Sequence, residues 1–303
     1  MAMTRAQFRK QLQEGLNSVF GLAYKAHTPR WKECFEIEDS SKAYEEDTLL
    51  VGLGGAVVKG EGAAVTYDEG GESYVSTYNA KTYALAFALT QEAIDDNLYG
   101  KIGSKYSKSL ARSLNYTKEV EGASVFNNGF DSSYPGGDGV ELFSTSHPLW
   151  GGGTGSNTLS TAADLSEAAL EDAVIDIRGF VDDRGIPIVA MSKKLIVPRQ
   201  LEFEAERILN SNLRVDTANN DLNALKARSS FPEGFACNVF LSDPDAWFIL
   251  TDCPDGLKHM RRQGVRRGVE GDFETNNLRY KAYERYDFGW TDWRGAYGSA
   301  GAS

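Results

Sequence analysis

The stretch TQEAIDDNLYGKIGSKYSKSLARSLNYTKEVEGASVF, which runs from Thr90 to Phe126, decides the fold. Apolar residues return at about every fourth position along it, which is the spacing of one helix face. They are Ile94, Leu98, Ile102, Tyr106, Leu110, Leu114, Val120, Ala123 and Phe126. With Thr90 as the N-cap, the pattern predicts one helix of about 36 residues and ~54 Å, which is long for a globular enzyme and suits a structural beam. Gly100 and Gly103 each cost up to ~1 kcal/mol within a helix, so any break or kink is expected there.

A second amphipathic helix is predicted at the N-terminus. Thr4 and Gln7 have the spacing of a capping box, and the helix ends at Thr28-Pro29 at the latest. The apolar positions that follow at helical spacing are Phe8, Leu12, Leu16, Val19 and Phe20. Two partners suit this apolar face equally well: the core of its own molecule and a neighbouring molecule.

The region between these two helices is predicted to be extended. Residues Glu33 to Asp47 form an acidic run, which is typical of a solvated face. Seven glycines then fall between Gly52 and Gly71, among Val and Tyr residues that favour strands. We therefore predict a long β-hairpin from Thr48 to Leu89. Because it has few large apolar residues near its tip, it cannot hold a core of its own and must project and contact something else.

The second half of the chain alternates between helix and strand signals. A helix is predicted from Leu165 to Val181, followed by two short strands, IPIVA (Ile186–Ala190) and KKLIVP (Lys193–Pro198). Pro198 suits the first turn of the next helix. The alternation predicts a compact α/β subdomain that lasts to about Gly264. The apolar residues expected on the inward faces of these two helices are Leu170, Val174, Ile177, Val181, Leu201, Ala205, Ile208 and Leu209.

The chain closes on NLRYKAYERYDFGWTDW, from Asn277 to Trp293. Its alternating pattern predicts strands that pack against the long helix. Tyr283 and Arg285 are interpreted as lying out of phase, which predicts a β-bulge. The inward positions are Leu278, Tyr280, Ala282, Tyr286, Phe288 and Trp290. Together with the earlier segments, these strands place the chain in the α+β class.

Only LFSTSHPLWGGGTGSN, from Leu142 to Asn157, looks like a place for chemistry. A serine hydrolase needs a nucleophile on a strained turn and a base held by a third group, but the chain has no GxSxG, and no orienting partner for His147 is evident. Its glycines match neither a P-loop, which needs a following Lys, nor a dinucleotide fingerprint. We interpret the stretch as architecture, and we predict no catalytic residue.

The composition narrows the function further. Three cysteines and three histidines are scattered along the chain, which predicts no disulfide framework, no metal site and no cofactor. No apolar run approaches the ~18 residues of a membrane span, and the start has no signal-peptide core, so the protein is expected in the cytoplasm or in something assembled there. A net charge of −11 argues against a general nucleic-acid binder. The same charge suits a container that holds DNA without sticking to it.

Two charged groupings remain. The only basic cluster is KHMRRQGVRRG, from Lys258 to Gly268. In an acidic chain its arginines favour ion pairs with an acidic partner surface over phosphate, because the guanidinium binds carboxylates in a bidentate way. The carboxylate pairs Asp95-Asp96 and Asp182-Asp183 are interpreted as solvated.

The order of the pieces resembles the major capsid proteins of tailed bacteriophages, which share the Hong Kong 97-type fold. That order is helical arm, projecting hairpin, beam helix, α/β subdomain and closing strands. The chain is most similar to the Mu-like head subunits, and the similarity covers nearly its whole length. The segments that carry it are YALAFALTQEAIDDNLYG, LFSTSHPLWGGGTGSN, KKLIVPRQLEFEAERILNS and YDFGWTDWRG.

This resemblance implies an N-terminal arm (1–47), an extended loop (48–89), a peripheral domain with the spine helix (90–163), an axial domain (164–271) and closing strands of the peripheral domain (272–303). It implies a structural protein, not an enzyme, that assembles into hexamers and pentamers of an icosahedral shell around packaged DNA. An encapsulin-like nanocompartment that encloses a cargo enzyme is the alternative. A small-molecule enzyme, suggested only by the stretch around His147, is a third reading.

The resemblance also implies partners and a location. The chief partner is the protein itself; a portal protein and a possible decoration protein are others. Because the arm has no helical leader, a scaffold or protease, if used, would be a separate protein. We expect the protein in the virion, after assembly in the host cytoplasm, near double-stranded DNA and away from membranes. The candidates for contacts between subunits are Glu36, Glu45, Glu46, Val57, Val65, Tyr67, Tyr74, Arg261, Arg262, Arg266 and Arg267.

Overall fold

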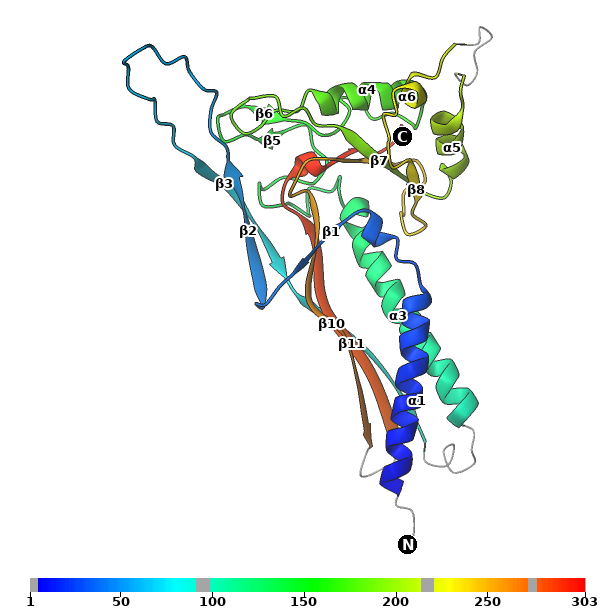
Figure 1. Ribbon diagram of the computed structural model, residues 1–303. Helices are drawn as coiled ribbons and strands as arrows, with labels where there is room; N and C mark the ends of the chain where they lie inside the picture. The colour runs from blue at the N-terminus through cyan, green and yellow to red at the C-terminus, as the bar shows by residue number, and fades with distance from the viewer. Residues whose placement is uncertain (1–4, 91–98, 214–220, 272–276, 303) are drawn as a thin grey trace.

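The computed structural model describes residues 5–90, 99–213, 221–271 and 277–302. Figure 1 shows an elongated arm of helices and long strands that descends from a broader α/β part, with a loop that projects from one side. The N-terminus lies at the far end of the arm, and the C-terminus lies in the α/β part.

The arm is built around two helices that lie side by side, α1 (Arg5–Ala26) and α3 (Tyr99–Asn127). Their buried faces meet strand β11 in a small core formed by Leu16, Phe20, Leu110, Ala111, Leu114, Tyr280 and Ala282. The apolar face of α1 therefore packs on its own subunit, which settles the alternative left open above. Thr4 and the side chains of Phe8 and Leu12 lie outside the described part of the chain.

The spine helix α3 has 29 described residues and passes through Gly100 and Gly103 without a break. Gly103 allows α1 to approach closely, because a Cβ there would lie 3.3 Å from Leu16 Cδ2. Two positions of the predicted inner face, Tyr106 and Val120, are exposed instead, because a spacing of four residues drifts around a helix of 3.6 residues per turn. Their neighbours Ser107 and Glu119 are buried in their place. The segment that holds Ile94, Asp95, Asp96 and Leu98 lies outside the described residues.

A long sheet lies beside these helices, with strand order β1-β10-β11-β4. Its strands are β1 (Glu36–Asp39), β10 (Leu257–Gly271), β11 (Leu278–Trp290) and β4 (Lys81–Leu89). β1 is parallel to β10, and the other pairs are antiparallel.

The predicted bulge lies in β10 and not in β11. Pairing shifts between Arg261 and Gln263 and again between Gln263 and Arg266, so β10 carries the extra residues. In β11 the alternation is unbroken, because Glu284 takes the inward position between Ala282 and Tyr286.

Glu284 keeps its inward position by pairing with a buried cation. Lys118 Nζ of α3 lies 2.7 Å from Glu284 Oε2, and the Tyr24 hydroxyl of α1 donates to the same oxygen. Burial lowers the pKa of Lys118, and the attraction of Glu284 opposes that shift. One buried charged group thus joins α1, α3 and β11.

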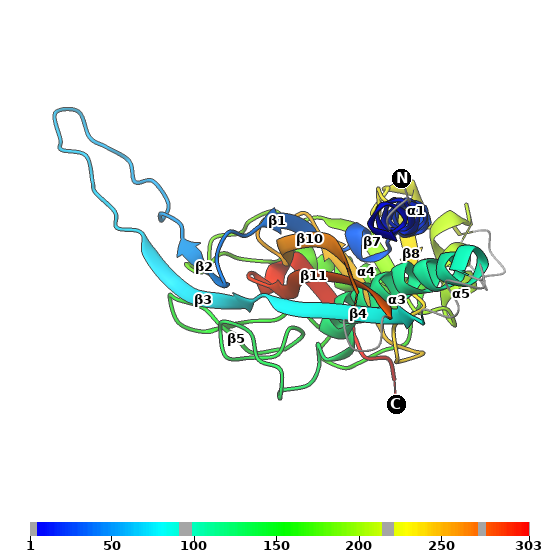
Figure 2. The ribbon, with the colours of Figure 1, turned by 90° about the horizontal axis from the view of Figure 1, so that it is seen from below.

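The projecting element is a separate ribbon of β2 (Tyr44–Val51) and β3 (Gly71–Asn79). The predicted hairpin, Thr48 to Leu89, is wrong at both ends. The observed ribbon begins four residues earlier, at Tyr44, and β4 pairs with β11 instead of β2. Residues 52–70, all of which the structure describes, contain no strand. Figure 2 shows this loop extending well beyond the rest of the molecule.

The α/β part is built on a short sheet with the order β12-β9-β7-β8. Its strands are β12 (Ala296–Ser299), β9 (Trp247–Thr251), β7 (Ser192–Val197) and β8 (Phe235–Cys237). Its helices are α4 (Glu167–Arg178), α5 (Glu202–Asn210) and α6 (Ala224–Ala227). The main core lies here and includes Leu170, Ile177, Leu195, Trp247, Phe248 and Trp293, all fully buried or nearly so.

Two predictions for this part are corrected. Ile186–Ala190 form no strand in the described structure; Pro187 makes only an isolated bridge to Val181, which lies beyond the end of α4. Val189 has a φ of 53°, which a β-branched residue rarely adopts and which a strand does not allow. Pro198 lies in a turn just before α5 and not in its first turn, because its carbonyl accepts from Leu201 N.

Candidate functional site

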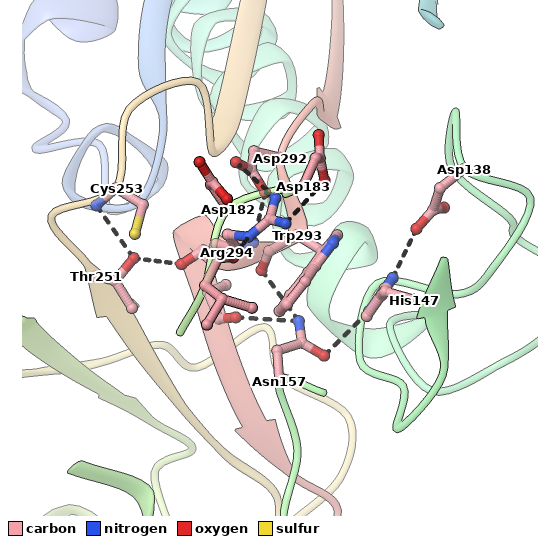
Figure 3. Close-up of polar contacts among 12 residues, drawn as sticks. Asp138, His147, Asn157, Asp182, Asp183, Thr251, Cys253, Asp292, Trp293 and Arg294 are labelled. Atoms are coloured by element: carbon pink, nitrogen blue, oxygen red, sulfur yellow. Dashed lines mark hydrogen bonds and ion pairs between the residues drawn. The ribbon is translucent and has the colours of Figure 1, made fainter. Parts of the chain in front are cut away.

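The long and short sheets meet at a short 3₁₀ helix, η2 (Trp293–Gly295), between β11 and β12. Arg294 is buried at this junction (Figure 3). Its guanidinium donates to Asp183 Oδ1 at 2.9 Å, to Asp292 Oδ1 at 3.1 Å and to the Val181 carbonyl at 2.7 Å. Arg294 therefore ties the end of α4 to the strand crossing.

The charges at the junction compensate one another. Burial alone would lower the pKa of Arg294, but Asp292 and Asp183 outweigh it and leave that pKa above its usual value. Burial also raises the pKa of Asp292 against the pull of Arg294. Asp183 is buried here, so its interpretation as a solvated carboxylate is wrong.

The Ser/His/Gly stretch is packed against this same junction. Asn157, which is fully buried, donates from Nδ2 to the carbonyls of Leu142, Trp293 and Ala296 at 2.7–3.1 Å. Its Oδ1 accepts from Ser144 N at 3.0 Å. Three carbonyls around one amide nitrogen fix the orientation of the Asn157 side chain, which then fastens both ends of the stretch to η2.

His147 is a buried link in this network and not a free loop residue. Its Nε2 lies 3.2 Å from Asn157 Oδ1, and its Nδ1 lies 2.6 Å from Asp138 Oδ2. Its ring stacks on Trp293 at 4.6 Å between centroids and 4° between planes. His147 has the carboxylate partner that sequence reasoning missed.

The arrangement nonetheless suits structure better than catalysis. His147 and Asp138 are both fully buried, and the second ring nitrogen faces an amide oxygen instead of a nucleophile. β5 (His147–Pro148) pairs with β6 (Thr154–Gly155), which closes the glycine turn between them. Within the described residues, no three His, Cys, Asp or Glu side chains are placed to hold a metal ion.

The basic cluster and the acidic run are partly paired within the subunit. Arg261 binds Asp39 in a bidentate way, with Nε–Oδ1 and Nη2–Oδ2 distances of 2.6 and 2.8 Å. Lys258 is buried among Asp47, Asp255 and Glu38. Burial would lower the pKa of Lys258, but hydrogen bonds to these three carboxylates raise it above its usual value.

The other charged candidates differ in how free they are. Arg267 donates to the Asn17 carbonyl and lies over the Phe20 ring, so both of these contacts hold it against α1 of its own subunit. Glu45 accepts from Ser40 in its own turn. The side chains of Glu36, Glu46 and Arg266 are exposed, and that of Arg262 is half-buried.

The apolar candidates separate clearly. Val57, Val65 and Tyr67 lie on the 52–70 loop and are 65%, 63% and 93% exposed, and their neighbour Val58 is fully exposed. Tyr74 instead packs against the subunit's own main core, and burial raises its pKa. Among these candidates, the exposed apolar side chains are therefore those of the loop between the two ribbon strands.

Several key residues carry no motif that sequence reasoning could use. Asn157 reaches the Trp293 carbonyl only after the chain folds, since 136 positions separate the two residues. Arg294 likewise reaches Asp183 across 111 positions. Glu284 could have been predicted from the sequence, because it falls in phase with the inward residues of β11.

No helix in the described part of the chain is long and apolar enough to span a membrane.

The fold matches those of known shell subunits. The capsid of the cyanophage P-SCSP1u is 11% identical, with a TM-score of 0.58 over 91% of this chain and 89% of that one. The procapsid of bacteriophage JBD30 is 14% identical, with a TM-score of 0.55 over 99% and 77%. A virus-like particle from Pyrococcus furiosus is 10% identical, with a TM-score of 0.52 over 94% and 98%. No curated protein sequence matches the chain.

The phage capsid protein family matches residues 73–299, which span most of the chain. The chain therefore belongs to this family, whose fold is the mixed α and β type expected from the sequence. It is a phage capsid protein, and therefore a structural protein of the virion and not an enzyme.

Proposed function

We propose that this subunit assembles with copies of itself into hexamers and pentamers of an icosahedral shell around packaged DNA. The observation that carries the proposal is the projecting loop 52–70. Its exposed valines and Tyr67 find no cover in their own subunit, and a neighbouring copy is the surface that would bury them.

The domain division implied by the sequence is kept as part of this proposal. Residues 1–47 would be the arm, 48–89 the extended loop, 90–163 with 272–303 the peripheral domain, and 164–271 the axial domain. The packing of α1 along α3 supports an arm that lies on its own subunit. The pairing of β4 with β11 supports moving β4 from the extended loop to the peripheral domain. The sheet order likewise supports moving β10 from the axial to the peripheral domain and β12 from the peripheral to the axial domain.

The charged residues would add contacts around the apolar loop. Glu36 and Glu46 are free carboxylates, and Arg262 and Arg266 are the arginines of the basic cluster that remain for a neighbour. Arg261, Arg267 and Glu45 are already engaged within the subunit, so we propose a smaller role for them. Tyr74 would support the ribbon from within.

The wider setting of the protein follows from this role. A portal protein, a separate scaffold or protease, and a decoration protein would be its partners, and the shell would form in the host cytoplasm. The net charge of −11 suits a container whose surface must not bind double-stranded DNA tightly. The sequence segments quoted above support placement near the Mu-like head subunits.

A nanocompartment around a cargo enzyme is the second candidate, because shells of both kinds can use one fold. The match to a phage capsid family favours the first. A portal or terminase gene beside this one would support a phage head, whereas a peroxidase or ferritin-like gene would support a nanocompartment.

Electron microscopy of the purified protein in negative stain tests the proposal. Closed shells or isolated capsomers are the expected result, and particles from infected or induced cells should hold double-stranded DNA. Uniform monomers or dimers at every concentration would contradict it. Closed shells filled with one cargo protein would support the nanocompartment instead.

A further inference from the structure

The projecting loop is tied together at its root. Asp68, on the returning limb, accepts a hydrogen bond from Gly54 N, on the outgoing limb, at 2.6 Å. Gly54 allows this approach, because a Cβ there would lie 3.1 Å from Asp68 Oδ2. The two limbs are thus joined just beyond the ribbon, and only residues 55–67 remain beyond the tie.

A residue from a distant part of the chain holds this root. Arg184 Nη1 lies 3.0 and 3.2 Å from the two carboxylate oxygens of Asp68, and its Nη2 donates to the Glu69 carbonyl. The guanidinium also lies over the ring of Trp150, 5.5 Å from its centroid. Trp150 in turn covers the start of β3, since a Cβ on Gly71 would meet its ring at 3.1 Å.

The turn that carries Arg184 is itself firmly anchored. Asp182 Oδ1 accepts from both Arg184 N and Ile186 N at 2.8 Å, and Gly185 supplies the positive φ of 83° that the turn needs. Asp183 is held by the buried Arg294, and its carbonyl accepts from Gly151 N at 2.8 Å. Arg184 therefore connects the loop to the rigid junction between the two sheets.

We propose that Arg184 is a positioning residue that latches the root of the projecting loop to its own subunit before assembly. A loop that already points in one direction loses less conformational freedom when it binds a neighbour, so the latch would strengthen that contact without touching the neighbour. The importance of the latch for assembly rests on the proposed function, but the latch itself exists in the unassembled subunit and can be tested there.

Hydrogen–deuterium exchange of the unassembled full-length subunit tests the latch directly. Arg184→Ala and Asp68→Asn should each speed exchange of the Gly54 and Glu69 amides, which donate to the Asp68 carboxylate, by up to about fivefold. This is the protection that an exposed ion pair of about 1 kcal/mol provides. Arg184→Lys should restore part of the protection, because lysine keeps the positive charge but lacks the planar guanidinium that can donate from several nitrogens at once. Lys59→Ala, at the exposed tip, is the matched control and should change nothing.

The pattern of exchange separates a latch from general damage to the fold. The Arg184→Ala variant should keep the protection of the Arg184 and Ile186 amides, which Asp182 provides, and should melt at the wild-type temperature. The double variant Arg184→Ala, Asp68→Asn should show less than the sum of the two single effects, because both substitutions remove the same ion pair, although only Asp68→Asn also weakens the bond from Gly54 N. Wild-type exchange of 52–70 in both single variants would overturn the proposal, as would two fully additive effects.

Assembly gives an independent readout. If the latch prepares the loop, Arg184→Ala should raise the protein concentration needed for shells severalfold, while Lys108→Ala, on the exposed side of α3 and away from the loop, should not. Faster loop exchange with an unchanged threshold would show that the latch exists but does not prepare assembly, which overturns the positioning role alone. Failure of the wild-type protein to form shells would instead contradict the proposed function.

Discussion

Asp183 and Arg184 are adjacent residues that act on opposite sides of one turn. Asp183 faces inward and binds the buried Arg294 at 2.9 Å, and Arg184 faces outward and binds Asp68 of the projecting loop at 3.0 Å. A single turn thus connects the projecting loop with the junction between the two sheets.

The same junction makes His147 important for stability, contrary to what a loop histidine suggests. We expect His147→Ala to lower the free energy of unfolding by about 2–5 kcal/mol, because it removes the stacking on Trp293 and leaves the buried Asp138 carboxylate without its partner. Chemical denaturation of the unassembled subunit measures this. The exposed neighbour Ser146→Ala is the control and should change stability by less than about 0.5 kcal/mol. A loss below that value for His147→Ala would show that the contacts with Asp138 and Asn157 carry little weight.

A second buried histidine should make the subunit sensitive to acid. His259 lies in the arm between Phe288 and Trp31, with ring centroids 4.4 Å away in each case. Burial, assisted by the nearby Lys118, lowers its pKa from 6.5 to about 3. Between these two pH values the unfolded chain binds a proton that the folded chain does not, so stability falls as the pH falls from 6.5 toward 3.

Replacing the ring isolates this effect. We expect His259→Phe, which keeps an aromatic side chain in the stack, to lose part of the acid sensitivity, by up to roughly 4 kcal/mol at pH 3. Stability curves of wild type and variant should separate progressively below pH 6.5 and run parallel above pH 7. Parallel curves over the whole range would mean that His259 is as easily protonated in the folded subunit as in the unfolded chain.

The sequence could predict which positions of a helix or strand are buried, but not which residues from separate segments come into contact. Periodicity predicted the two arm helices and the inward positions of β11, because each pattern directly reflects burial on one face. It could not reveal that Asp138 and Asn157 converge on His147, because those contacts depend on the path of an irregular loop that no periodic pattern describes. Nor could it reveal that Arg184 meets Asp68, because these residues are 116 positions apart. The error over β4 has the same origin: a strand signal is local, whereas the choice of β11 over β2 as its partner depends on the whole sheet.

The charged candidates predict a moderate effect of salt on assembly. Exposed charges are screened within ~8 Å at 0.15 M salt, whereas apolar burial by the loop persists. Light scattering should therefore show slower assembly, but not its loss, between 50 and 500 mM salt, values chosen around the screening range. Arg266→Glu should reduce this salt dependence, while Lys108→Glu, the same charge change on the exposed side of α3, should leave it unaltered. Assembly that does not respond to salt in the wild type would contradict a role for these charges.

The central claim is that the tip of the projecting loop joins neighbouring subunits. Replacing residues 56–66 with a short Gly-Ser linker removes Val57, Val58 and Val65 but keeps Gly54 and Asp68, and with them the contact to Arg184. Because the removed residues are exposed, the free energy of unfolding should change by less than about 1 kcal/mol. Electron microscopy of this variant beside the wild type, at equal concentration, is the most direct measurement. Our account predicts folded subunits or capsomers but no closed shells; shells that close normally without the tip would contradict it.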